Sequence, residues 1–154
     1  MWNHAPEGYL CPFCRNIATG EGEYPVEIVR RYEDVIVKMN PRWRLANPGA
    51  ALVIPVEHYE NVYDLPDTLG ASLQRATRET AQAMKRAYNC DGISMRQHNE
   101  SAGDQDVWHY HVHVIPRFDG DGFANTEAMI AAPEEIHRLS ALLRDYWPTG
   151  ESIG

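Results

Sequence analysis

The chain has 154 residues and a formal net charge of −8, a length that suffices for one domain with its own core. The acidic balance argues against binding nucleic acid through its phosphate backbone, because such proteins normally present a basic face. The longest apolar run, residues 50–54, is far too short to cross a membrane, and the amino terminus does not resemble a signal peptide. Three cysteines do not make a secreted disulfide framework. We therefore expect one cytoplasmic domain over residues 1–154, with no nucleic acid and no membrane as partner.

The first half of the chain predicts a short helix followed by antiparallel strands. Residues 11–19 are expected to form the helix, because Gly20 follows them as a stop signal. Two β-rich runs at 27–32 and 35–39 are separated by two acidic residues and predict a hairpin. The turn-forming residues of 41–49 predict a loop, and the apolar run after it predicts a strand that ends at residue 54.

The second half is dominated by one long amphipathic helix. Apolar residues between 67 and 88 recur every three or four positions, which is the spacing of a helix face. A strand is predicted at 93–97, a polar loop at 99–105, and a last helix from about 133 to 146. The order of hairpin, strand, long helix, hairpin and helix indicates an α+β fold with an antiparallel sheet.

Three histidines alternate with other residues between Trp108 and Arg117. A period of two is that of a β-strand, so His109, His111 and His113 are expected to share one face. The outer pair would lie about 13 Å apart at the strand rise of about 3.3 Å, too far for all three to bind one metal ion easily. Two of them could do so with a ligand from elsewhere. Imidazoles in a row cost desolvation, and this favours a functional role over a purely structural one.

A neutral imidazole on a rigid strand is a nucleophile at neutral pH, because one ring nitrogen has a free lone pair. The other nitrogen must keep its proton and donate it to an acceptor, such as a backbone carbonyl, so that attack comes from one tautomer. The electrophile would be a carbonyl or phosphoryl group. The amides of the 99–105 loop can stabilise the negative charge that develops.

The sequence His109-x-His111-x-His113 resembles the motif of the histidine triad (HIT) family of nucleotide hydrolases and transferases. Further segments resemble other sequence motifs of that family: the CxxC at 11–14, the strand at 48–55 with His58, the segment 97–107 before the triad, and the residues 115–117 that follow the triad. The resemblance covers about residues 11–123 and implies a HIT-like core there, with the predicted helix at about 133–146 following it. It also implies a homodimer.

The resemblance implies a mechanism and a set of site residues. His111 would attack the α-phosphorus of a nucleotide and form a covalent nucleotidyl-histidine, which water or another acceptor then releases. His109 and His113 would orient His111 and manage charge and protons, while Asn99 and Gln105 would contact phosphate. The expected substrates are dinucleoside polyphosphates or nucleoside phosphoramidates, and this chemistry requires no cofactor.

Asn40 stands where the family commonly places a residue on the ribose. An asparagine before Pro41 is equally typical of a turn that ends a strand. The sequence is therefore compatible with both a ribose contact and a structural turn at Asn40.

The CxxC pair has three interpretations. We favour a reduced cysteine pair without metal at a helix start, with structural zinc at Cys11 and Cys14 as the alternative. A redox pair is the third interpretation, but the βαβ context typical of such pairs is missing. Members that bind zinc through the CxxC have a histidine where this chain has Ala50, so one expected ligand is missing. Cys11, Cys14 and His109 would then hold zinc only if His58, His4 or water completed the set.

A second departure from the family pattern is Asp106, where many members have serine or threonine. A carboxylate beside a phosphate site repels the substrate unless it faces away or pairs with a cation, so Asp106 is left out of the expected phosphate contacts. Ala50 and Asp106 together raise a different class of function, a nucleotide-binding module without turnover. A nucleotidyltransferase or phosphorylase with the same intermediate, and a metal-dependent hydrolase, are further alternatives.

Overall fold

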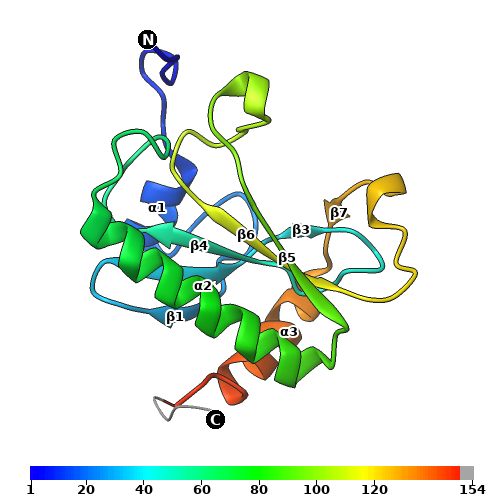
Figure 1. Ribbon diagram of the computed structural model, residues 1–154. Helices are drawn as coiled ribbons and strands as arrows, with labels where there is room; N and C mark the ends of the chain where they lie inside the picture. The colour runs from blue at the N-terminus through cyan, green and yellow to red at the C-terminus, as the bar shows by residue number, and fades with distance from the viewer. Residues whose placement is uncertain (150–154) are drawn as a thin grey trace.

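The computed structural model describes residues 1–149, and its centre is a five-stranded sheet (Figure 1). Every neighbouring pair of strands is antiparallel. The strands, in their order across the sheet, are β1 (Ile28–Arg31), β2 (Val35–Met39), β4 (Ala51–Pro55), β6 (Val112–Arg117) and β5 (Gly92–Gln97). This confirms the predicted α+β fold with an antiparallel sheet.

Three helices cover the sheet unequally. Helices α2 (Asp67–Tyr88) and α3 (Pro133–Asp145) pack on one face and bury the larger apolar core against it (Figure 1). Helix α1 (Pro12–Thr19) packs on the other face, over a smaller apolar cluster. Two single-turn 3-10 helices, Ser101–Gly103 and Phe123–Asn125, lie in the loops before and after β6. The uncovered remainder of the α1 face is where a cavity forms.

The bounds of the helices follow from local chemistry. Helix α2 spans the predicted residues, with Asp67 in its first turn and two basic residues in its last, which complements the helix dipole. Asn89 ends it in the left-handed conformation at φ 49°. At α1, the Cys11 thiol accepts a hydrogen bond from the Cys14 backbone N–H at 3.4 Å, and Gly20 ends the helix at φ 71°.

Two predictions about strands are wrong. Strand β6 begins at Val112 rather than at Trp108, because the register would place Pro55 opposite Tyr110 and proline has no N–H for the ladder. Residues 41–49 are not all loop. Strand β3 (Arg42–Trp43) pairs with β7 (Met129–Ile130) in a second, two-stranded sheet. Strands of two residues are too short for a periodic pattern to predict them.

Two further observations bear on partners. Within residues 1–149 the helices are each too short or too polar to cross a membrane. Strand β5 forms one edge of the sheet, and its Met95 side chain is 58% exposed. A homodimer stays a prediction.

Replacing Gly49 by alanine is expected to destabilise the protein. Gly49 has φ +90°, and an added Cβ would lie 2.7 Å from the ring of Tyr88. The left-handed backbone and the overlap together should lower the free energy of unfolding by about 2–4 kcal/mol. Gly70→Ala in α2 is the matched control, because its Cβ meets nothing within 4 Å and should raise stability by about 0.5–1 kcal/mol. Urea unfolding of both variants checks this, and an unchanged midpoint for Gly49→Ala would contradict it.

Candidate active site

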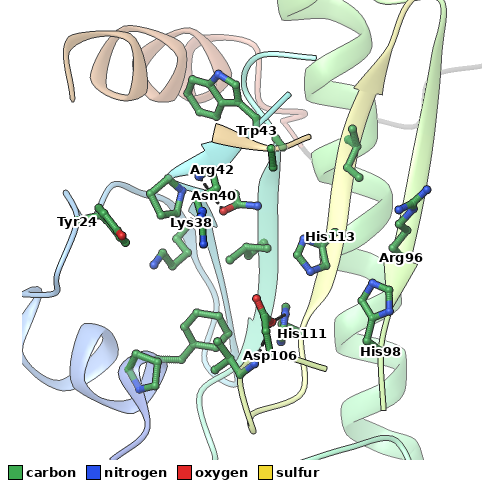
Figure 2. A pocket seen from close by; sticks show the side chains of 18 of the residues that line it. Tyr24, Lys38, Asn40, Arg42, Trp43, Arg96, His98, Asp106, His111 and His113 are labelled. Atoms are coloured by element: carbon green, nitrogen blue, oxygen red, sulfur yellow. Dashed lines mark hydrogen bonds and ion pairs between the residues drawn. The ribbon is translucent and has the colours of Figure 1, made fainter. Parts of the chain in front are cut away.

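A cavity of about 550 Å³ opens on the α1 face of the sheet, between α1, the central strands and β3 (Figure 2). This volume is within the usual range for small-molecule sites, about 300–1,000 Å³. Although the whole chain is acidic, the cavity has more cationic than acidic lining residues: Lys38, Arg42, Arg44 and Arg96 against Glu23 and Asp106. Its local charge therefore suits an anionic ligand.

The cavity floor contains a row of residues that are direct neighbours across four strands. Lys38 on β2 pairs with Leu52 on β4, Leu52 pairs with His113 on β6, and His113 pairs with Arg96 on β5. Because side chains alternate between faces along a strand, all four belong to the face opposite α2. The sheet register thus brings residues that are far apart in sequence into one row.

His111 has a fixed tautomer in this cavity. Its ring is 3% exposed, and its Nδ1 lies 2.7 Å from the backbone oxygen of His109. A carbonyl oxygen only accepts, so Nδ1 carries the proton and donates it, and Nε2 keeps its lone pair. The Phe13 ring meets the imidazole edge-on at 5.1 Å between centroids. Burial lowers the pKa of His111.

His113 lines the cavity beside His111, with the two ring centroids 4.9 Å apart. Burial and, next, the neighbouring His111 lower the pKa of His113 to about 4. A third imidazole, His98, lies 5.8 Å from His113 on the side away from β2 (Figure 2). Its Nδ1 donates to the Gly103 carbonyl at 2.8 Å.

Asp106 lies at the mouth of the site. Its Oδ1 is 3.8 Å from His111 Nε2, and its side chain is 78% exposed. This distance is too long for a hydrogen bond. A carboxylate at this place nevertheless puts a negative charge next to the atom that would meet a phosphate.

His109 does not share the cavity with the other two histidines, contrary to the expectation of one common face. Its ring is fully buried, and Nε2 donates to the Pro55 carbonyl at 2.9 Å. Its Nδ1 is 3.3 Å from Cys11 Sγ and 3.6 Å from Cys14 Sγ. The row divides here because residues 109–111 precede β6 and do not follow strand geometry.

His109 belongs to a group of four potential metal ligands: Cys11, Cys14, His58 and His109. One ligand atom from each lies within 4.8 Å of the others. His58 Nδ1 is 3.3 Å from Cys14 Sγ, so His58 provides the fourth potential ligand. Burial and, next, the hydrogen bond to Cys11 raise the pKa of Cys14 to about 11.

The other two positions considered for this group lie elsewhere. Ala50 lines the cavity. His4 pairs instead with Glu60 at 2.8 Å. The departure at Ala50 therefore does not leave this group one ligand short.

The three predicted substrate-binding residues have different positions. Asn40 lines the cavity, and its Oδ1 accepts from the Arg42 N–H at 3.1 Å. The Asn99 side chain accepts from Val62 N–H and exchanges hydrogen bonds with Gln97. Asn99 is not among the residues that line the cavity.

Gln105 is also outside the cavity lining. Its Nε2 donates to the carbonyls of Glu60 and Val107, and its Oε1 accepts from Glu100 N–H at 2.7 Å. Asn99 and Gln105 hold the loop in front of the histidines, and a phosphate contact for either stays a prediction.

Sequence reasoning missed Lys38, Arg96 and Phe13 as cavity residues. One signal was available for Lys38, which is the only charged residue in the apolar run Val35–Met39. Phe13 and Arg96 had no such signal, because their place in the cavity depends on how α1 and β5 pack.

Known proteins share the sequence pattern and the fold of this chain. The family model for the HIT domain matches residues 23–120. The chain belongs to the histidine triad family. The Protein hit of Bacillus subtilis is 35% identical over 135 residues, which is 85% of this chain and 90% of that protein.

Solved structures of histidine triad proteins share the fold. A HIT-like protein of Bartonella henselae, described as involved in cell-cycle regulation, is 28% identical with a TM-score of 0.79 and covers 94% of this chain and 99% of its own. A histidine triad family protein of Mycobacterium smegmatis, described as Zn-bound, is 25% identical with a TM-score of 0.72 and covers 88% of this chain and 94% of its own.

Proposed function

We propose that this histidine triad protein is a nucleotide hydrolase that attacks the α-phosphorus through His111. The observation that carries the proposal is the hydrogen bond from His111 Nδ1 to the His109 carbonyl at 2.7 Å. It leaves the Nε2 lone pair for the cavity without the need for a general base. The cationic lining of the cavity supports an anionic substrate.

The reaction proceeds in two displacements. The Nε2 lone pair of His111 forms a bond to the α-phosphorus, while the bond from phosphorus to the leaving oxygen or nitrogen breaks. That atom departs with its electron pair and takes up a proton. Water then attacks the phosphorus and gives up a proton, the N–P bond breaks, and its electron pair returns to Nε2 as the nucleoside monophosphate leaves. His113, 4.9 Å from His111 between ring centroids, is placed to help move these protons.

Two relatives with named activities support a nucleotide as substrate. An Arabidopsis thaliana protein named adenylylsulfatase HINT3 is 28% identical over 123 residues, and a Mycobacterium tuberculosis protein named AP-4-A phosphorylase is 33% identical over 100. The matches cover 58% and 49% of those proteins. A phosphorylase would use the same intermediate with phosphate in place of water, so the acceptor has to be measured. Within the hydrolase class we propose dinucleoside polyphosphates or nucleoside phosphoramidates.

His111→Ala is expected to abolish turnover, because the variant lacks the nucleophile. The measurement is cleavage of diadenosine triphosphate, diadenosine tetraphosphate and adenosine phosphoramidate, with water or inorganic phosphate as acceptor. Activity should fall by at least about a thousandfold. His137→Ala is the control, because His137 lies on α3, outside the cavity lining, and pairs with Glu27. Retained turnover by His111→Ala would refute the mechanism, and tight binding without turnover by the wild type would indicate a binding module.

Asp106→Asn is expected to strengthen binding of adenosine monophosphate. The substitution removes a negative charge 3.8 Å from His111 Nε2, and two unit charges about 4 Å apart repel by about 1 kcal/mol in water. The Kd from calorimetry should therefore fall about fivefold. Asp104→Asn, at an exposed acid outside the cavity lining, controls for net charge and should leave the Kd unchanged. Weaker binding by Asp106→Asn would mean that the carboxylate assists the ligand.

We also propose that Cys11, Cys14, His58 and His109 hold a structural zinc ion. Their donor set of two sulfurs and two nitrogens is typical of structural zinc, and bond lengths of about 2.0–2.3 Å need ligand atoms about 3.3–3.8 Å apart. The Pro55 carbonyl accepts from His109 Nε2, which leaves Nδ1 as the ligand atom and orients the ring. A bound zinc would join α1 to the segments of His58 and His109, and no step of the reaction passes through it.

The zinc proposal predicts one zinc per chain by elemental analysis. His58→Ala should lower this content and the thermal midpoint, whereas His4→Ala, whose side chain pairs with Glu60, should change neither. A strong chelator should likewise lower the midpoint of the wild type. Purified protein that contains no zinc and takes up none would refute the proposal.

A further inference from the structure

Lys38 is a buried cation among the residues that line the cavity. It is 4% exposed and lies in β2, where the other four residues are apolar and buried. Its Nζ donates to Asn16 Oδ1 on α1 at 2.7 Å and lies 5.4 Å from the centroid of the Phe13 ring. Burying an ammonium group costs free energy unless the group is paired. The groups around Lys38 therefore indicate its role.

The protein provides only part of the hydrogen-bond partners and opposite charge that would stabilise the ammonium group of Lys38. Within residues 1–149 no carboxylate oxygen lies within the ion-pair distance of 4.0 Å. An ammonium group has three N–H donors, and the one hydrogen bond to Asn16 uses one of them. Burial lowers the pKa of Lys38 to about 8, so the amine is still mostly protonated at pH 7. Lys38 is thus a hydrogen-bond donor in the cavity wall with capacity for a ligand.

Lys38 and the nucleophile lie at different ends of the cavity. Figure 2 shows Lys38 and Tyr24 on one side, His111 and His113 on the other, and Asn40 between them. Lys38 and His113 are separated by two strand spacings, which is about 10 Å. A nucleoside whose phosphorus is at His111 and which extends past Asn40 therefore brings its base to Lys38.

The surroundings of Lys38 suit a flat ring with a polar edge. Phe13, Tyr24 and Leu52 line the cavity there and provide aromatic and apolar surface. The ammonium group is a donor only and has no acceptor. It matches guanine, whose O6 and N7 are two adjacent acceptors, better than adenine, which offers N7 as an acceptor next to the N6 amino donor.

We propose that Lys38 determines base specificity and selects nucleotides whose purine has a 6-oxo group, as in guanine and hypoxanthine, over adenine. The inference rests on the proposed function, because it places the base relative to a phosphorus at His111. Lys38 acts on the base edge and takes no part in the bond changes at phosphorus.

The test compares inosine and adenosine phosphoramidates, which differ at the 6-position of the base. The wild type should show a kcat/KM for inosine about tenfold higher, within the range for one base-edge contact. Lys38→Met, which keeps the length of the side chain and removes its donors, should bring the ratio to about one. Arg42→Met is the matched control, because it removes an exposed cation from the same cavity and should leave the ratio unchanged.

Calorimetric Kd values of inosine and adenosine monophosphates separate this inference from the proposed function. If no substrate is turned over but inosine monophosphate binds tighter and Lys38→Met loses the preference, the hydrolase proposal fails and the base specificity stands. A wild type that favours adenosine or shows no preference overturns the inference, even if Lys38→Met does not fold. A preference that persists in a folded Lys38→Met overturns it as well.

Discussion

Period-two alternation along the central strands sends one set of side chains toward α2 and α3 and the other set toward α1. The first set is apolar and forms the larger core. The second set includes apolar residues under α1, such as Ile36 and Ile54, and polar residues that line the cavity, such as Lys38 and His113. Because α1 is only eight residues long, it covers only part of its face. The site depends on this difference between the two faces, since one face provides the stability that lets the other remain open.

The histidine row acquires its roles from where strand pairing stops. Pro55 at the end of β4 has no N–H to extend the ladder, and its carbonyl accepts from His109 instead. The chain then brings the His109 carbonyl to His111 Nδ1. One short irregular segment thus turns His109 toward the cysteines and fixes the proton of His111. His109 therefore connects the two sites: its ring belongs to the Cys-His group and its carbonyl accepts from His111 in the cavity.

The local charge of the cavity is opposite in sign to that of the whole chain. The net charge of −8 argues against an extended basic surface, and the cavity still concentrates four cationic side chains. A small anion can therefore be attracted at short range, where screening by salt is weakest. Asp106 works against this attraction, and Lys38 adds a donor at the far end of the cavity. We propose that these two residues influence which anionic ligand binds in the cavity.

Much of the fold could be read from the sequence, because long elements have strong periodic signals. Helix α2 and strand β2 have the predicted bounds, and the antiparallel order follows from the order of the elements. The pair β3 and β7 could not be predicted, since each strand has two residues. The triad motif identified the family. Strand alternation accounts for the position of His113 on the cavity face of β6, whereas His111 lies just before that strand.

The amino-acid sequence by itself determined the family, the sheet and the presence of a histidine row, because these depend on local pattern. Only the tertiary structure decided that His109 lies with the cysteines, that His58 completes that group, and that Asn99 and Gln105 hydrogen-bond within the loop. It also decided that Lys38 lines the cavity and that, among residues 1–149, its only side-chain hydrogen bond is to Asn16. Each of these depends on contacts between segments that are distant in sequence, and their distances and hydrogen-bond partners follow from the packing of helices and loops on the sheet.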